Sequence, residues 1–380
     1  MPDRYTTSFS DLPHWKYRAC TDFLLSLARV HPTWTPLAQE LLFEAIWIQK
    51  SDDGMGYKAK QLLEGWKMTE RKFRTKTLRL EGNLGILLGV RKDEEIWSKV
   101  EVLDHVNEES IEFLDIYSRF SSLKVLSIHA RFQHSNPLTE AKISLPNLER
   151  FELHYPETYK DFAHDWKYPP PNRARPTGLQ RFDLPSLKHL SLDVRDEDSV
   201  EWIRENLGEW LLRIEILDIR ASLWGDAFIV TILNHPELFG DKLKHLSVWY
   251  KARNCPGDME FFSWETKGFD LETFHLNVES SLYNDGIDDY IDELFKLLDR
   301  LGEIARGEFD GFKAKRVIYE GQGWDDHMLL AWIEERDALL YEFEERESEL
   351  DRDRLEWPDR YGIEGVSGRW EDRFAHLSIA

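Results

Sequence analysis

The stretch LKHLSL (Leu187–Leu192) places leucines at its first, fourth and sixth positions. The fourth and sixth positions are separated by one residue, so in an extended strand their side chains lie on the same face. This alternation predicts a short strand that is buried on one side and presents the residues between the leucines on the other. The first leucine precedes the strand and is expected to close the turn that leads into it.

The same spacing of apolar residues recurs along the chain at a nearly constant step. It is found in LKVLSI, LERFEL, LKHLSL, IEILDI, LKHLSV and LETFHL, which begin at Leu123, Leu148, Leu187, Ile214, Leu243 and Leu271. All but one of these steps fall in the period of about 20–29 residues that is typical of leucine-rich repeats. The exception, from Leu148 to Leu187, is longer and contains an insertion.

Between these stretches the apolar spacing becomes helical. Asp198–Trp210 and Asp226–Phe239 are predicted to be helices, because their apolar residues recur three or four positions apart. Strands and helices that alternate at a fixed step predict an α/β fold, a leucine-rich-repeat solenoid of short parallel strands plus helices, with the strands on its concave side. The predicted solenoid covers residues 70–325.

The ends of the predicted solenoid are less regular. TKTLRL (Thr75–Leu80) and AKRVIY (Ala314–Tyr319) fit the spacing, whereas IEFLDI (Ile111–Ile116) fits it but lies too close to LKVLSI for a full repeat. Residues 326–380 are predicted to be an acidic helical cap and tail, since the last repeat of a solenoid must face water. The alternative is a separate acidic recruitment tail. Further helices are predicted at Asp288–Ala305 and Asp326–Leu355.

The charge balance and the cysteine content exclude several classes of protein. The chain has 380 residues, 49 of them basic and 71 acidic, for a net charge of −22. So negative a chain is not expected to bind nucleic acid or an anionic membrane as a whole. Cys20 and Cys255 are the only cysteines, which leaves no disulfide framework and no cysteine-rich zinc site. Without a long apolar run or an apolar leader, we expect a protein of the cytoplasm or the nucleus.

The region before the repeats is rich in helical spacing. In LLSLARVHPTWTPLAQELLFEAIWI (Leu24–Ile48) the pattern indicates two helices joined by a short turn. Thr21 or Asp22 is expected to cap the first helix. Thr35-Pro36 is expected to open the second, because proline suits the first position of a helix.

This stretch resembles the second half of an F-box, in particular the fungal type that ends in Leu-x-Arg/Lys-Val-x-x-x-Trp-x-Pro-Leu-Ala. The family commonly carries leucine-rich repeats after the F-box. The resemblance implies that residues 8–50 form an F-box-like helical segment that binds a Skp-type adaptor of an SCF-type ubiquitin ligase, while the repeats hold an unknown protein target. The matching residues are Leu24, Leu25, Leu27, Ala28, Val30, Trp34, Pro36, Leu37, Ala38, Leu41, Leu42 and Phe43. Those implied to pack in the F-box core or against the adaptor are Leu24, Leu27, Val30, Trp34 and Leu37.

Two alternatives stay open for this segment. Only HWKYRACT separates Leu12-Pro13 from Asp22, which is shorter than the first helix of that family, so the segment is either an F-box or a helical cap on the solenoid. The predicted function is that of a substrate-recognition adaptor. The alternative is a leucine-rich-repeat binding scaffold with a vestigial F-box and no role in ubiquitylation. The motifs GxSxG, HExxH and GxxxxGK[ST] are absent, so no catalysis, cofactor or metal is expected.

The residues between the leucines define a candidate surface on the concave face. One column contains Ser127, Glu152, Ser191, Asp218, Ser247 and His275, and the next contains His129, His154, Asp193, Arg220, Trp249 and Asn277. Arginine and tryptophan are enriched among the residues that dominate binding energy at interfaces. The residues predicted to contact the partner are His129, Glu152, His154, Asp193, Asp218, Arg220, Trp249 and His275.

The longest step between repeats contains a proline-rich insertion, Pro156–Asp183. Its Pro169–Pro171 run favours an extended polyproline II path, so a projecting loop is predicted. Long insertions often carry function. The alternative is a variable surface excursion without a role. Its candidate binding residues are Trp166, Tyr168, Arg173 and Arg175.

Overall fold

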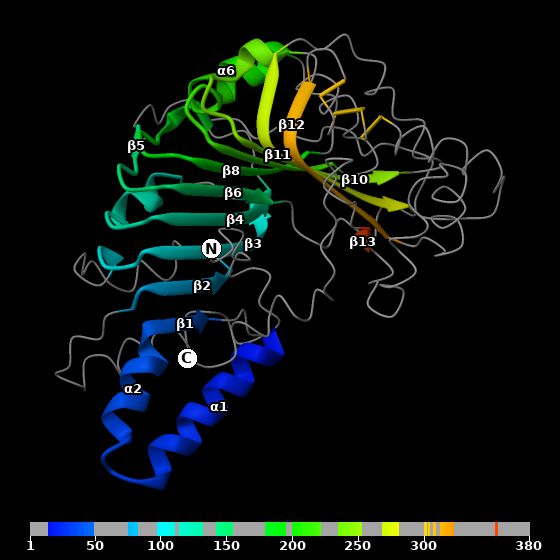
Figure 1. The fold of residues 1–380 in the computed structure, drawn as a ribbon. Helices are drawn as coiled ribbons and strands as arrows, with labels where there is room; N and C mark the ends of the chain where they lie inside the picture. The colour runs from blue at the N-terminus through cyan, green and yellow to red at the C-terminus, as the bar shows by residue number, and fades with distance from the viewer. Residues whose placement is uncertain are drawn as a thin grey trace, which may run out of the picture. The chain divides into compact units, whose positions relative to one another are not determined.

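The computed structural model describes parts of the chain that together form two compact units, Met1–Lys188 and His189–Ala380. Figure 1 shows the elements of each unit. The described residues are 14–48, 75–82, 97–110, 114–131, 142–154, 179–194, 200–221, 235–252, 268–280, 300–301, 303–304, 307–308, 312–322 and 354–355.

The first unit begins with a helical hairpin. Helix α1 (His14–Val30) and helix α2 (Thr35–Glu44) are joined by a short turn. The expected start of the second helix at Thr35 is confirmed, and the Thr35 hydroxyl donates a hydrogen bond of 2.8 Å to the carbonyl of Ala28. The expected cap at Thr21 or Asp22 is wrong, because α1 already begins at His14 and runs through both positions.

Helix α2 continues into strand β1 (Ala45–Ile48) without an intervening loop. The backbone becomes extended at Ala45, with φ −124° and ψ 120°. The helical spacing predicts Ala45 and Ile46 within the helix, and this prediction is wrong. Phe43, Ile46 and Ile48 repeat the spacing that marks the other strands, and burying Ile46 and Ile48 against the sheet outweighs local helix propensity.

The strands of the first unit are all parallel in the main sheet. After β1 the order is β2 (Thr77–Glu81), β3 (Val102–Ser110), β4 (Val125–Arg131) and β6 (Arg150–His154), each paired with the next. Sequence spacing missed β3. Its third apolar position is occupied by His105, which is buried beside Leu80 and Ile128 as an apolar residue would be.

The core of the first unit lies on one face of this sheet. Leu78, Leu103, Leu126 and Phe151 form one buried row across the strands. The stretch at 111–116, which fits the apolar spacing but lies too close to LKVLSI for a full repeat, is a 3₁₀-helix in its described part, η2 (Leu114–Arg119). Only a short turn separates this segment from β4, so no strand forms here. Tyr117 and Phe120 are instead fully buried against the sheet.

A second small sheet pairs β5 (Ile143–Ser144) with β7 (Phe182–Asp183), and η5 (Leu179–Arg181) precedes β7. Phe182 is buried, and its ring lies 5.6 Å from that of Phe151. The end of the predicted projecting loop therefore belongs to the core. Residues 155–178, with the rest of that loop, lie outside the described residues.

The second unit repeats the same arrangement. Strands β8 (His189–Val194), β9 (Ile216–Ala221), β10 (His245–Ala252), β11 (Phe269–Ser280) and β12 (Phe312–Gln322) are parallel and pair in this order. The strand expected at 314–319 is thus confirmed within β12. Strand β13 (Arg354–Leu355) pairs antiparallel with β12. Its two residues were expected in the helix at 326–355. They are extended instead, because they pair with the free edge of β12.

Two helical predictions in the second unit have different outcomes. Helix α6 (Val200–Leu211) confirms the helix expected at 198–210, and Ile203 and Leu207 on its inner side are buried. For the helix expected at 226–239, residues 222–234 lie outside the described part, and the described end is a 3₁₀-helix, η6 (Pro236–Leu238). The described residues thus form an α/β fold with parallel sheet strands and few helices.

One position at the start of nine of the parallel strands alternates between glutamate and lysine. The pairs Lys76–Glu44, Lys124–Glu101, Lys188–Glu149 and Lys244–Glu272 have N–O distances of 2.6, 2.7, 3.9 and 3.5 Å. Because opposite charges are neighbours in the observed order, a strand paired one place out of order would meet a like charge. The Glu/Lys row, taken along the chain, is Glu44, Lys76, Glu101, Lys124, Glu149, Lys188, Glu215, Lys244 and Glu272.

Candidate functional site

The two columns predicted from the sequence are in register within each unit. In the first unit Ser127 pairs with Glu152 and His129 with His154. The first column continues over β3, β2 and β1 through Asp104, Arg79 and Trp47. Sequence reasoning missed Trp47 and Asp104 because β1 and β3 were not recognised as strands, and it did not extend the column to Arg79 on β2. We call this polar face of the first unit, from Trp47 to His154, the charged face.

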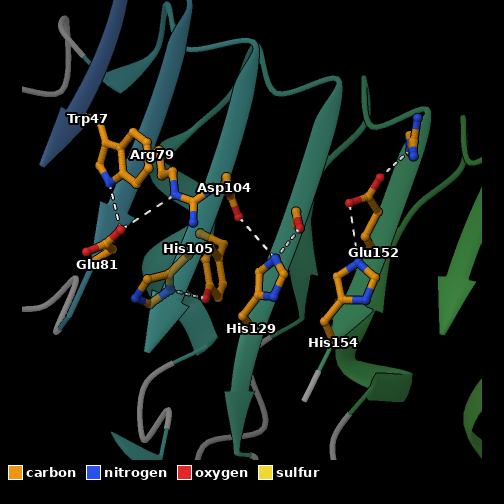
Figure 2. Close-up of polar contacts among 11 residues, drawn as sticks. Trp47, Arg79, Glu81, Asp104, His105, His129, Glu152 and His154 are labelled. Atoms are coloured by element: carbon orange, nitrogen blue, oxygen red, sulfur yellow. Dashed lines mark hydrogen bonds and ion pairs between the residues drawn. The ribbon is translucent and has the colours of Figure 1, made fainter. Parts of the chain in front are cut away.

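At the β1–β2 end of the charged face an arginine is held between an aromatic ring and two carboxylates. The indole N–H of Trp47 donates a hydrogen bond of 2.7 Å to Glu81 Oε1. The Arg79 guanidinium lies 4.3 Å from the centroid of the Trp47 ring and 3.2 Å from Asp104 Oδ2. Figure 2 shows these side chains side by side on neighbouring strands. Arg79 is thus both stacked and neutralised.

The centre of the charged face contains a serine, a histidine and an aspartate. His129 Nε2 lies 3.2 Å from Ser127 Oγ and 3.4 Å from Asp104 Oδ1. In a catalytic triad the hydroxyl and the carboxylate contact opposite nitrogens of the imidazole, so that one orients the ring while the other loses its proton. Here both contact the same nitrogen, so this arrangement lacks the geometry of a triad.

Glu152 is the buried carboxylate of the β6 end, with only 1% of its surface exposed. Arg150 forms an ion pair with it, and His154 Nε2 lies 3.5 Å from its Oε2. Burial by itself raises the pKa of Glu152, but hydrogen bonds from His154 and Ser127 and the charge of Arg150 together hold that pKa below its usual range. Glu152 therefore carries a full negative charge inside the protein at neutral pH.

On the opposite, apolar face, His105 is held as a neutral imidazole. Its Nε2–H donates a hydrogen bond of 2.8 Å to the carbonyl of Gly82, so its Nδ1 accepts the hydrogen bond of 2.7 Å from the Tyr117 hydroxyl. Burial lowers the pKa of His105 to about 4, against the smaller opposing effects of Gly82 and Asp104. Burial also raises the pKa of Tyr117 above its usual range. His105 is a structural residue of the core.

The polar face of the second unit, which we call the mixed face, is more open. Ser191, Asp218, Ser247 and His275 form one row across it. His189 Nε2 lies 2.6 Å from Asp218 Oδ2, and Ser247 Oγ lies 3.3 Å from His275 Nδ1. In the next row, Asp193, Arg220, Trp249 and Asn277 are all partly exposed.

The helical hairpin exposes half of the twelve residues matched to the F-box. Val30 is 75% exposed, Trp34 47% and Leu37 49%, whereas Leu24 and Leu27 are half-buried. Val30, Trp34 and Leu37 therefore form no core within the described chain, and their contact with an adaptor stays a prediction. Phe23, Leu25 and Leu41 are exposed as well. We call the six exposed residues together the hairpin surface.

Several predicted features lie beyond these sites. Trp166, Tyr168, Arg173 and Arg175 of the predicted loop fall outside the described residues. Among the residues that the structure describes, no three histidine, cysteine, aspartate or glutamate side chains are grouped to hold a metal ion. Within the same residues, no helix combines the length and the hydropathy needed to cross a bilayer.

The fold and the sites define an α/β protein with parallel strands, whose polar faces are lined by side chains from successive strands. Comparison with protein-family models, with curated proteins and with solved structures finds no match to this chain. The F-box resemblance therefore stands on the residues of the helical hairpin.

Proposed function

We propose that this chain is a protein–protein interaction protein, the substrate-recognition adaptor of an SCF-type ubiquitin ligase. In this proposal the hairpin surface binds a Skp-type adaptor. The polar faces of a leucine-rich-repeat solenoid hold the target. One observation carries the proposal: the apolar side chains left exposed on α1 and α2 are largely those that match the F-box motif.

The exposure of these side chains supports a binding role. Six large apolar residues are exposed on the helical hairpin: Phe23, Leu25, Val30, Trp34, Leu37 and Leu41. Burying one such side chain is worth about 1.5–3 kcal/mol, so a group of them is costly to leave in water. Phe23 and Val30 lie seven positions apart on α1, and Leu37 and Leu41 four apart on α2, so the members of each pair share a side of their helix. Large exposed apolar patches are typical of interaction sites. A partner that covers both helices would gain this free energy.

The repeat geometry supports the solenoid part of the proposal. Strand β4 begins at Val125 and β6 at Arg150, while β9 begins at Ile216 and β10 at His245. Both spacings fit the leucine-rich period of about 20–29 residues. Buried apolar residues recur at the same place in the parallel strands, for example Leu126, Phe151, Leu190 and Leu217. Stacked repeats of this kind commonly present extended binding surfaces.

One observation favours the alternative, a leucine-rich-repeat scaffold with a vestigial F-box. Helix α1 runs without interruption from His14 to Val30. A family F-box has a separate first helix and a loop before this position. A continuous helix would present the hairpin surface without that first helix, so binding of the adaptor must be measured directly.

The test is co-expression of the tagged full chain with the Skp-type adaptor of its own organism, followed by pull-down. The variant Val30→Asp/Leu37→Asp places two charges on the hairpin surface. Both side chains are exposed, so the substitutions do not disturb the core. We expect it to abolish binding. Leu212→Asp is the matched control, because Leu212 is 52% exposed but lies in the second unit. It should bind as the parent does.

The outcomes separate the two candidates. Binding that survives Val30→Asp/Leu37→Asp would contradict the role of the hairpin surface. A folded parent chain that does not bind the adaptor would leave the scaffold as the better function. Circular dichroism and urea unfolding establish that each variant is folded before its binding is interpreted.

A further inference from the structure

The arginines on the two polar faces differ in their partners. Arg79 forms an ion pair with Asp104, and Arg150 with Glu152. Arg220, on the mixed face, forms no ion pair among the described residues. Its guanidinium carbon lies 5.1 Å from the centroid of the Trp249 ring. Within the described part of the chain, Arg220 thus contacts an aromatic ring and pairs with no carboxylate.

The carboxylates beside Arg220 in the sheet do not neutralise it. Asp218, on the same strand β9, is engaged by His189 at 2.6 Å. Asp193 lies opposite Arg220 in the register of β8 and β9, yet no ion pair joins these two described residues. Neither of these two described carboxylates therefore occupies the N–H donors of the guanidinium, which can serve a group of a bound protein.

We propose that Arg220 and Trp249 form an anchor for a carboxylate side chain, an aspartate or glutamate of the bound target protein. This inference rests on the proposed function in assigning the mixed face to a protein target. A guanidinium stacked on a ring retains the planar fork of N–H donors that matches the two oxygens of a carboxylate. The ring restricts the arginine before binding, which lowers the entropy lost when the complex forms.

The position of this pair suits an extended acidic segment of the target. Arg220 and Trp249 are direct neighbours on β9 and β10, and Asn277 follows in the same row on β11. All three are partly exposed, unlike Asp104 and Glu152 of the charged face, which are 1% exposed. A target can reach the anchor without displacing a buried ion pair. Arginine and tryptophan are also the side chains that most often dominate interface energies.

The net charge of −22 works against long-range attraction of an acidic target. The target must therefore be recognised by direct contact with Arg220, which affects the dissociation rate more than the association rate. The anchor then gives specificity, because only a carboxylate that contacts Arg220 and Trp249 overcomes the repulsion between the acidic chain and an acidic target.

The test uses fluorescent twelve-residue peptides with the purified full chain. Each peptide carries one central glutamate or aspartate among neutral residues, and its partner carries glutamine or asparagine there. Fluorescence anisotropy measures binding. We expect the acidic peptides to bind at least tenfold more tightly than their amide partners. We expect Arg220→Gln to remove that difference and Trp249→Leu to reduce it.

Two further variants complete the design. Arg220→Lys keeps the charge without the planar fork, so it should retain only part of the preference for the carboxylate. Lys242→Gln, in the exposed turn before β10, removes one positive charge elsewhere and should change nothing. Urea unfolding midpoints equal to that of the parent show that each variant is folded.

Three results would contradict the anchor. The first is equal binding of acidic and amide peptides, and the second is an Arg220→Gln variant that binds the peptides as the parent does. The third is no binding of any acidic peptide at 1 mM, about the weakest affinity of interest. Tighter binding of a phosphoserine peptide would reassign the ligand to a phosphate. The adaptor pull-down tests the hairpin surface, whereas the peptide assay tests the anchor. A chain that does not bind the adaptor but binds acidic peptides more tightly than amide peptides would contradict only the role in the ubiquitin ligase.

Discussion

Lys124 Nζ lies 2.7 Å from Oε2 of Glu101, and this pair is one step of the Glu/Lys row at the strand starts. The same neighbours are joined in the backbone, since the amide of Lys124 donates a hydrogen bond of 2.7 Å to the carbonyl of Glu101. The side-chain ion pair and the backbone hydrogen bond thus join the same two neighbouring strands, β3 and β4. A single exposed pair contributes little to stability, but alternation along a series of strands disfavours every pairing displaced by one repeat.

Reversing one charge of this row should destabilise the first unit. Lys124→Glu places an acid between Glu101 and Glu149, and like charges on adjacent strands repel. We expect the free energy of unfolding to fall by about 0.5–1 kcal/mol in low salt. The measurement is urea unfolding, with Lys142→Glu as the control at an exposed lysine outside the row. At high salt, about 1 M NaCl, the loss should largely vanish; a loss that is independent of salt would contradict the electrostatic origin.

His105 should make the first unit less stable in mild acid. Its pKa is about 4 in the folded chain, against 6.5 for an unperturbed histidine, so the unfolded chain binds the proton more tightly. The stabilisation is complete above pH 6.5 and is lost as the pH falls from 6.5 to 4, by about 3 kcal/mol. Urea unfolding at several pH values measures it.

The variant His105→Leu isolates this contribution. Leucine suits the position, because the neighbours of His105 in its row are Leu80 and Ile128. We expect the loss of stability between pH 6.5 and pH 4 to shrink in this variant, whereas His31→Leu at an exposed histidine should leave it unchanged. An unaltered pH profile in His105→Leu would show that another group is responsible.

Removing the charge of Glu152 should be costly. Glu152→Gln removes the buried negative charge that Arg150 and His154 contact, and breaking a buried ion pair costs about 3–5 kcal/mol. Glu149→Gln, which removes an exposed carboxylate just before the same strand, should change the free energy of unfolding by less than about 0.5 kcal/mol. Denaturant unfolding of the two variants compares them. Equal effects would mean that burial of Glu152 is unimportant.

Two glycines of the second unit should respond in opposite directions to alanine. A Cβ at Gly240 would lie 2.4 Å from the backbone oxygen of Leu212, so Gly240→Ala should destabilise by about 1–3 kcal/mol. A Cβ at Gly208, inside α6, meets nothing within 4 Å, so Gly208→Ala should stabilise by up to about 1 kcal/mol. Thermal unfolding of both variants tests the pair, and a neutral Gly240→Ala would contradict the close approach.

Much of the strand pattern could be read from local spacing. Leu187, Leu190 and Leu192 are all buried, as the spacing of LKHLSL predicts. The rule failed where one position departed from it. His105 replaces an apolar residue in β3 because the Tyr117 hydroxyl and the Gly82 carbonyl satisfy its ring, and those partners come from other segments. In β1 the apolar spacing of Phe43, Ile46 and Ile48 was present, but it directly follows the helical spacing of α2, so these residues were assigned to the helix.

The candidate sites show the same division. The rows Ser127–Glu152 and Asp218–Ser247 followed from the repeats. The sequence spacing did not predict that Glu152 is buried and charged, or that Arg220 is partly exposed and stacked on a ring. These properties depend on which side chains surround each residue.

The sequence by itself determined which residues share a face, since alternation along a strand is a local property of the extended backbone. The alternating Glu/Lys row is also present in the sequence, and it disfavours the pairing of strands that are one place out of order. Only the tertiary structure decided which polar groups meet. Arg79, Asp104 and His129 belong to three successive strands and lie far apart along the chain, yet parallel pairing brings them side by side. Their burial and partners are therefore set by the packing of several strands.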